Sequence, residues 1–122
     1  MKMIYVRPNY KEKEIEISIE NVNDELELYY EMLNCDMIDI TTITVNDVEY
    51  DIIHDDAFLL KRPLVPTLYV NNELIIFGAF LISRVNEDGE EIGLTHKEID
   101  NFLEYMYRQQ RPLKEWIKNL KQ

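Results

Sequence analysis

Residues 74–82 read Leu-Ile-Ile-Phe-Gly-Ala-Phe-Leu-Ile, and none of these nine side chains is polar. The segment is too short to be a membrane-spanning helix, which needs about 20 apolar residues. Its length and its β-branched and aromatic content predict a strand that is buried on both faces. We expect one long central strand over residues 73–85, with the highest burial of the chain at 74–82. Gly78 indicates a bend in this strand or the close approach of another backbone.

The composition is typical of an ordinary globular protein. A chain of 122 residues predicts one domain that can bury a core without disulfides. The single cysteine, Cys35, cannot form an internal disulfide, and the N-terminal segment turns polar at Arg7 before any signal peptide is complete. Both features favour a cytoplasmic protein.

The net charge of −11 is unevenly distributed along the chain. From residue 108 onward five bases stand against one acid, so this tail carries about +4 and residues 1–107 carry −15. An acidic body repels nucleic acid and anionic membranes, and neither is expected as a direct partner. The charge either serves solubility alone or attracts a partner protein with a basic surface.

The N-terminal half shows the alternation of strands. Residues 2–6 predict a first strand and residues 7–9 a turn, after which residues 14–19 alternate, with their isoleucines inward and their glutamates outward. Residues 37–45 predict a further strand. Its apolar residues change parity between Ile40 and Ile43, which predicts a bulge or a bend near Thr41-Thr42.

Further strands are expected at residues 48–52 and 67–70. Asn46-Asp47 predicts a tight hairpin turn before the first of them. The prolines within residues 63–66 indicate a loop or a sheet edge before the second.

Three helices are predicted from caps and from apolar residues at helical spacing. The first follows an N-cap at Asn21 or Asn23 and ends at Asn34. The second starts at the capping box that Thr95 forms with Glu98. The third has a proline in its first turn, Pro112, and is basic on its polar side. The expected apolar stripes are Leu26, Tyr29, Tyr30 and Leu33; Ile99, Phe102, Leu103 and Met106; and Leu113, Trp116, Ile117 and Leu120.

These elements predict an α+β fold with a mixed, mostly antiparallel sheet of about six strands and three helices. Residues 1–107 would form one domain. Residues 108–122 would form a basic amphipathic helix, docked on that domain or on a second copy, because an isolated helix of this length is marginal in water.

No arrangement in the sequence is typical of an active site. His54 with Asp56 or His96 could form an acid–base or metal site, but their spacing fits no ligand set, so we expect no catalytic residue, metal or cofactor. Residues 86–91 are rich in acids but lack the alternate ligand spacing of a calcium loop, so a solvated hairpin turn is predicted there. Lys61-Arg62 could bind a phosphate or carboxylate, or guard a sheet edge.

Two groups of residues are candidates for contacts with a partner. Charged residues in turns and loops are the candidates for binding a partner: Asp55, Asp56, Lys61, Arg62, Glu87, Asp88, Glu90 and Glu91. Apolar residues of the tail are the candidates for self-association: Leu113, Trp116, Ile117 and Leu120.

The chain resembles a family of small bacterial and phage proteins known as a domain of unknown function, DUF3846. Four segments carry the resemblance over about residues 2–106. They are Met37-Ile38-Asp39-Ile40, residues 51–61, residues 75–82, and residues 88–99 with the Asp-Gly-Glu turn and the Leu-Thr-x-x-Glu-Ile helix start. The resemblance implies an origin in a phage or another mobile element, and it implies no catalytic residues.

Three functional hypotheses follow. In the first, the chain is a non-enzymatic acidic protein that binds a host or phage protein with a basic surface and inhibits a nucleic-acid-handling defence enzyme, as anti-CRISPR and anti-restriction proteins do. In the second, it is a small-ligand-binding protein or small enzyme with a pocket near Lys61-Arg62 and Tyr50. In the third, it is a structural or accessory subunit that forms a homodimer through its tail.

Overall fold

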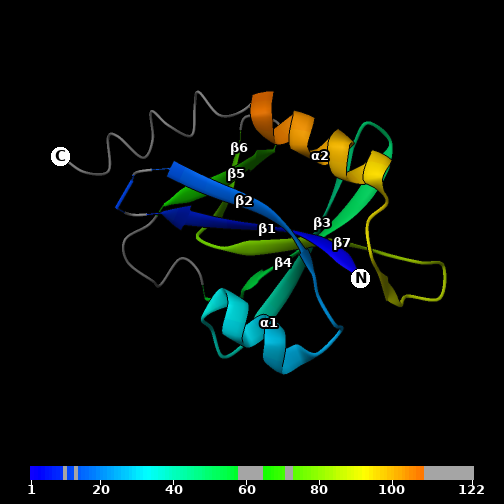
Figure 1. The fold of residues 1–122 in the computed structure, drawn as a ribbon, viewed down its shortest axis with the longest axis horizontal. Helices are drawn as coiled ribbons and strands as arrows, with labels where there is room; N and C mark the ends of the chain where they lie inside the picture. Colours follow the sequence, from blue (N-terminus) through cyan, green and yellow to red (C-terminus); the bar gives the residue numbers. More distant parts are fainter. Residues whose placement is uncertain (10, 13, 58–64, 71–72, 109–122) are drawn as a thin grey trace.

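The computed structural model describes residues 1–9, 11–12, 14–57, 65–70 and 73–108 (Figure 1). Two strands precede the first helix of this part of the chain and six strands separate it from the second, and both chain directions occur in each sheet. The elements are β1 (Lys2–Asn9), β2 (Glu14–Asn21), α1 (Leu26–Leu33), β3 (Ile38–Val45), β4 (Val48–Asp55), β5 (Pro66–Val70), β6 (Glu73–Phe77), β7 (Phe80–Val85), β8 (Glu91–Ile92) and α2 (His96–Arg108).

The main sheet has six strands, and every pairing in it is antiparallel. Its order is β2-β1-β7-β4-β3, with β8 paired to β7, while β5 and β6 form a separate two-stranded sheet. The predicted α+β class and the antiparallel sheet of about six strands are therefore confirmed. The described residues contain two helices rather than three, and the third predicted helix, which begins near Pro112, lies outside them.

The apolar segment 74–82 is not one strand, and this prediction was wrong. β6 pairs with β5, whereas β7 lies in the middle of the main sheet. Gly78 separates them with a φ of +85°, a conformation that side chains with a Cβ avoid. Its N–H donates to the Val65 carbonyl at 2.8 Å, and its carbonyl accepts from the Thr67 hydroxyl at 2.6 Å. No atom lies within 4 Å of a Cβ built on Gly78, so the turn, and not a close backbone approach, requires glycine here.

β7 is buried on both faces, as predicted. Phe80 and Ile82 belong to one apolar cluster and Leu81 to another, and all three are fully buried. High burial does not extend over the whole apolar segment, because Phe77 and Ala79 are only half-buried where the chain passes between the two sheets.

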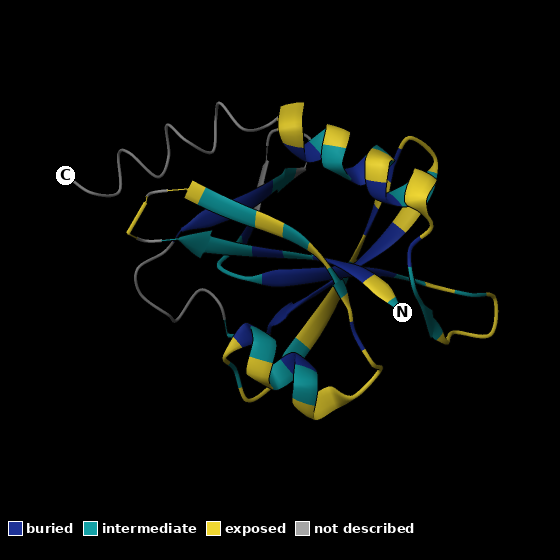
Figure 2. Ribbon diagram, viewed as in Figure 1, coloured by how far each residue is buried: buried dark blue, intermediate teal, exposed yellow. Residues whose placement is uncertain are grey.

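One face of the sheet, which we call the α2 face, carries Ile4, Ile52 and Ile82 under α2 (Figures 1 and 2). The predicted capping box is confirmed, since Thr95 and Glu98 exchange side-chain to backbone bonds of 2.8 and 3.2 Å. From this cap the helix presents a buried stripe to the sheet and to the β5–β6 hairpin, as predicted. The buried members are Ile99, Phe102 and Met106, and Leu103 is half-buried.

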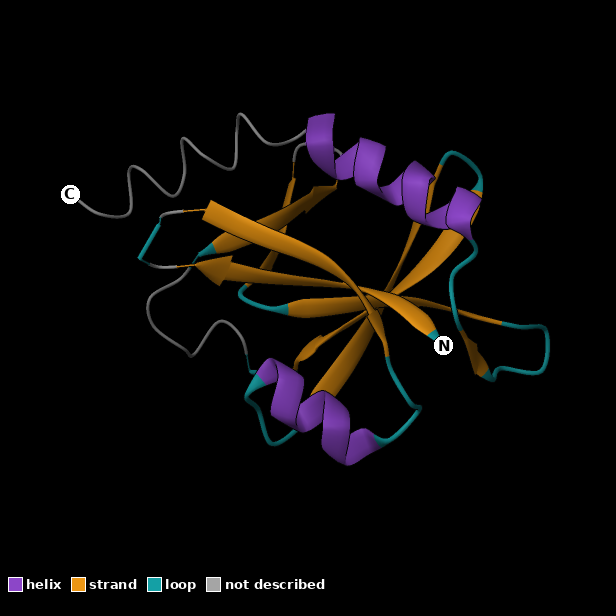
Figure 3. Cartoon of the chain, viewed as in Figure 1, coloured by secondary structure: helices purple, strands orange, loops and turns teal. Residues whose placement is uncertain are grey.

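The opposite face, which we call the α1 face, is covered by a shorter helix (Figure 3). Tyr29 and Leu33 of α1 pack against Leu81 and its neighbours. Asn34 ends the helix with a φ of 51°, as predicted. The predicted caps were wrong. Glu25 occupies the N-cap without a side-chain bond, and Asn21 accepts a hydrogen bond from the N-terminal amine instead.

Two predictions for the β1–β2 hairpin were wrong. β1 continues through residues 7–9, which were expected to turn. Ile17 and Ile19 do lie on the α2 face, opposite Val6 and Ile4, yet they are 38% and 43% exposed. The reason is position, because β2 is the edge strand and no described element covers this part of it.

β3 has no bulge at residues 41–42, contrary to the prediction. Its register with β4 is continuous from Ile38 opposite Asp55 to Val45 opposite Val48. The change of parity reflects a change of covered face along a straight strand. Ile38 packs on the α1 side, and Ile43 and Val45 pack on the α2 side.

Candidate functional site

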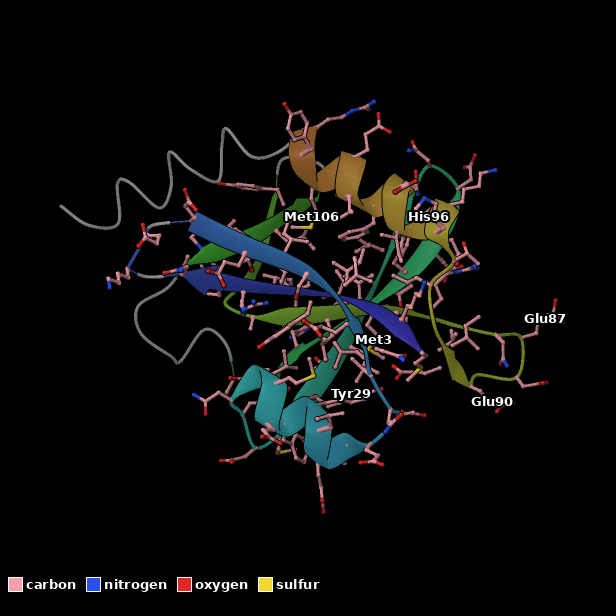
Figure 4. The ribbon with its side chains drawn as sticks, in the orientation of Figure 1. Met3, Tyr29, Glu87, Glu90, His96 and Met106 are labelled. Atoms are coloured by element: carbon pink, nitrogen blue, oxygen red, sulfur yellow. The ribbon has the colours of Figure 1, made fainter. Side chains whose placement is uncertain are left out.

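The acidic turn after β7 projects into solvent. Glu87, Asp88 and Glu90 are exposed, and Glu87 and Glu90 lie at the far end of the turn (Figure 4). Asn86 organises the turn, because its Oδ1 accepts the backbone N–H groups of Asp88 and Glu90 at 2.9 and 3.0 Å. The solvated hairpin turn predicted for this segment is therefore confirmed.

Glu91 leaves this group and takes part in a network under the α1 face. It accepts hydrogen bonds from the Tyr29 hydroxyl at 2.7 Å and from the Ser83 hydroxyl at 3.3 Å. Burial raises the pKa of the Glu91 carboxyl, the Tyr29 bond opposes that rise, and the nearby carboxylates of Asp24 and Asp51 add to it. Burial and the bonds to Glu91 and Asp24 also raise the pKa of Tyr29, so its hydroxyl remains a proton donor at neutral pH.

Asp55 and Asp56 lie at the other end of the sheet. β4 runs antiparallel to β7, so the end of β4 lies beside the start of β7, opposite the acidic turn. Asp55 is buried and accepts the Ala57 N–H at 2.9 Å. Asp56 is exposed, and its N–H donates to the Met37 carbonyl at 3.0 Å. The predicted acids thus form two separate groups, and Lys61 and Arg62 lie outside the described residues.

A surface at the start of β3 was missed by the sequence reasoning. Met37 is 63% exposed and Ile40 is 46% exposed, although Ile40 shares its parity with half-buried Ile38. Two exposed acids, Asp36 and Asp39, lie in this stretch, and a third, Asp56, is joined to it by the hydrogen bond from its backbone N–H to the Met37 carbonyl. We call the group the β3 patch; it consists of Asp36, Met37, Asp39, Ile40 and Asp56.

The patch belongs to a long segment without basic residues. Between Lys13 and Lys61 the chain has fourteen acids and no lysine or arginine. α1 lies within this segment, with Glu27 in its first turn, Glu31 exposed and no base in its last turn. A one-sided charge of this kind creates a negative potential that attracts cations and basic proteins and repels phosphate. This charge distribution is the signal in the sequence that could have located the surface.

The sequence profile of one family, described as Domain of unknown function (DUF3846), matches residues 1–107. The chain belongs to this family. The match ends within one residue of the end of α2, so it covers the whole described fold. No curated protein and no solved structure matches the chain.

The histidines of this DUF3846 domain do not form a site together. His54 is buried on β4, with its Nε2 2.8 Å from the Thr41 hydroxyl and its Nδ1 3.0 Å from the Asp55 carbonyl. His96 lies at the first residue of α2, as predicted, and pairs with Asp100 at 3.3 Å in solvent. Across the described ranges, no group of three or more histidine, cysteine or acidic side chains is arranged to hold a metal ion.

Two smaller features complete the description of the domain. Cys35, two residues after the end of α1, is half-buried against the apolar cluster of the α1 face. Neither of the two described helices is long and apolar enough to cross a membrane.

Proposed function

We propose that this protein is a protein-binding module whose β3 patch and acidic helix α1 bind a partner with a basic surface. The observation that carries the proposal is the exposure of Met37 and Ile40 at the start of the edge strand β3, next to the exposed side chains of Asp36, Asp39 and Asp56. An apolar centre supplies most of the binding energy of an interface, and charges at its rim set the partner and the rate of association. Methionine suits such a centre because its flexible side chain adapts to different partners.

The finer form of the proposal is a non-enzymatic inhibitor from a phage or another mobile element. Its target would be a host nucleic-acid-handling defence enzyme of the restriction or CRISPR type. Such enzymes bind the phosphate backbone with lysine and arginine side chains. A surface with many carboxylates and no base would compete for that groove, and α1 with the β3 patch supplies such a surface.

Two triple variants with the same change in charge test the proposal. One is Asp36→Lys, Asp39→Lys, Asp56→Lys in the β3 patch. The other is the matched control Glu87→Lys, Asp88→Lys, Glu90→Lys in the solvated turn. We expect a basic partner to be captured by the wild-type chain and by the turn variant, and to be lost by the patch variant. A panel of purified nucleases of the restriction and CRISPR types would then show whether that partner is inhibited. Equal capture by both variants would contradict the proposal.

A further inference from the structure

β3 is an edge of the main sheet that is open on one side. It pairs with β4 over eight consecutive positions, and in the part of the chain that the structure describes no strand pairs with its other side. Its sequence, Ile-Asp-Ile-Thr-Thr-Ile-Thr-Val, is rich in residues with high β propensity. It contains no proline and no lysine, two of the residues that commonly protect edge strands.

The hairpin turn determines which backbone groups of β3 point outward. Asn46 and Asp47 both have positive φ, 50° and 66°, which defines a type I′ turn. In such a hairpin the flanking pair Val45–Val48 is hydrogen-bonded, and bonded and non-bonded pairs then alternate along the strand. The residues in non-bonded pairs direct their N–H and C=O groups toward the open side. These residues are Ile38, Ile40, Thr42 and Thr44.

Other bonds agree with this alternation. The Ile40 N–H donates to Asp39 Oδ1 at 2.9 Å, as an outward group that is free of the β3–β4 ladder can do. The Asp56 N–H donates to the Met37 carbonyl, which continues the bonded positions beyond the end of β3. The open side is therefore a regular row of donors and acceptors at alternate residues, the arrangement that an added strand requires.

The other edge of the sheet is different, because β2 carries three glutamates, Glu14, Glu16 and Glu20. Glu16 accepts from Asn9 at 2.6 Å and pairs with Arg7 at 3.2 Å, while Arg7 also donates to Ser18 at 3.1 Å and lies 4.8 Å from the ring of Tyr5. These charged side chains are held across the β1–β2 pair. On β3 the only charged side chain is Asp39, so this edge is less protected against pairing than β2.

We infer that β3 binds a partner by strand addition, and that the added segment is extended and alternates apolar with basic residues. In an antiparallel addition the residues opposite Ile40 and Thr42 share the α1 face with them, where exposed Ile40 favours an apolar side chain. The intervening residues lie on the α2 face beside exposed Asp39, which favours lysine or arginine. A second copy of this chain is a poor occupant, since it also carries a net charge of −11. The inference rests on the proposed function and adds the geometry of the contact.

A short capped peptide of alternating valine and lysine tests the inference at low salt. In the predicted register the valines direct their N–H groups to β3, and the lysines direct theirs away from it. N-methylation of the valines should therefore weaken binding at least about tenfold, because several hydrogen bonds are lost. The matched peptide with N-methylated lysines should bind as the unmodified peptide does. The peptide should also slow amide exchange at Ile40, Thr42 and Thr44.

Two protein variants with the same net charge provide a second readout. Asp39→Asn should weaken peptide binding more than Asp47→Asn, since both remove one charge but only Asp39 lies beside the predicted lysines. Equal binding of the two methylated peptides would overturn strand addition and leave the basic-partner proposal standing. Strand addition by a basic segment would also be overturned if the unmodified peptide did not bind. It would be overturned as well if the amides of β3 became protected from exchange as the protein concentration rose, without any peptide. The proposed function fails separately, through equal capture by the two triple variants.

Discussion

The two faces of the main sheet are built in different ways. The α2 face is an apolar interior fixed by polar contacts at its rim: the Tyr50 hydroxyl donates to the Glu98 carbonyl at 2.7 Å, and Arg84 pairs with Glu98. The α1 face is smaller and holds polar groups within it, among them buried Asp51 and Ser83. Because its apolar cluster is the larger one, we expect the α2 face to supply most of the apolar burial that stabilises the fold. The α1 face, with α1 and the start of β3, bears the charge that folding alone does not require.

The largest expected effect is on the α2 face. Phe80→Ala should lower the free energy of unfolding by roughly 3–5 kcal/mol, because Phe80 is fully buried in the larger cluster. The matched variant on the other face, Leu81→Ala, should cost less, since its cluster is smaller and can relax around the cavity. Denaturant unfolding of both variants measures the comparison. An equal or larger cost for Leu81→Ala would contradict the ranking of the two faces.

The tail provides the next test. Residues 109–122 lie outside the described residues, and docking of their apolar stripe remains a prediction. If the tail docks on the body or on a second copy, Trp116→Ala should cost more in stability or dimer affinity than Lys114→Ala and Lys118→Ala together, because apolar burial outweighs exposed charge. Removal of the chain after Tyr107 should then change the melting temperature or the mass seen by sedimentation. A truncated chain with neither change would show that the tail is not docked.

The N-caps of the two helices should differ in their contribution to stability, by a smaller amount than the core substitutions. Thr95→Ala should cost about 1 kcal/mol, because it removes the side-chain acceptor of the capping box at α2. Asn23→Ala, next to α1, should cost almost nothing, since α1 has no side-chain cap. Thermal unfolding of the two variants measures this difference. A cost for Asn23→Ala that equals that for Thr95→Ala would indicate a cap at α1 that the structure does not show.

The smallest expected effect is a pH dependence of stability, with opposite signs at two glutamates. The pKa of Glu91 is raised, so the folded state binds its proton more tightly than the unfolded state, whose pKa is about 4.3. Its contribution to stability is present below that value and is lost as pH rises through the raised folded pKa. Glu91→Gln should therefore gain stability relative to the wild type as pH rises above about 4.

Glu98 serves as the control for this prediction. Burial alone would raise its pKa, but the bonds from Thr95 and the pairing with Arg84 hold the pKa of Glu98 below its usual value. Its contribution is present above the unfolded pKa and is lost as pH falls through the lowered folded pKa. Glu98→Gln should therefore lose stability relative to the wild type as pH rises toward the unfolded pKa of about 4.3. Parallel slopes for the two variants would contradict the assigned shifts.

Local signals predicted much of the fold. The capping box at Thr95, the Asn46-Asp47 turn and the stop at Asn34 were found because each depends on a few neighbouring residues. The prediction of a single strand over 74–82 was wrong because it used only neighbouring residues. Hydrophobicity alone does not distinguish a bend at Gly78 from a change of sheet, and the change is fixed by the distant partners Val65 and Thr67.

The binding surface was harder to predict than the fold. The rule that apolar residues point inward failed at Ile17, Ile19 and Ile40, because the sequence does not say which strands lie at the edges of the sheet. Glu91 was grouped with its acidic neighbours, yet its side chain turns toward Tyr29 on α1, far away in the sequence. The order of the strands decides the first case and the packing of α1 on the sheet decides the second, and both are properties of the tertiary structure.

Amide hydrogen exchange of the free protein tests the central claim, that β3 is an open edge, most directly. The account predicts fast exchange at Thr42 and Thr44, whose N–H groups point outward, and slow exchange at Thr41 and Ile43, whose N–H groups bond to β4. In the presence of a strand-adding partner, Thr42 and Thr44 should become slow as well. Slow exchange at Thr42 and Thr44 in the free monomer would show that another part of the chain already covers β3, and would contradict the account.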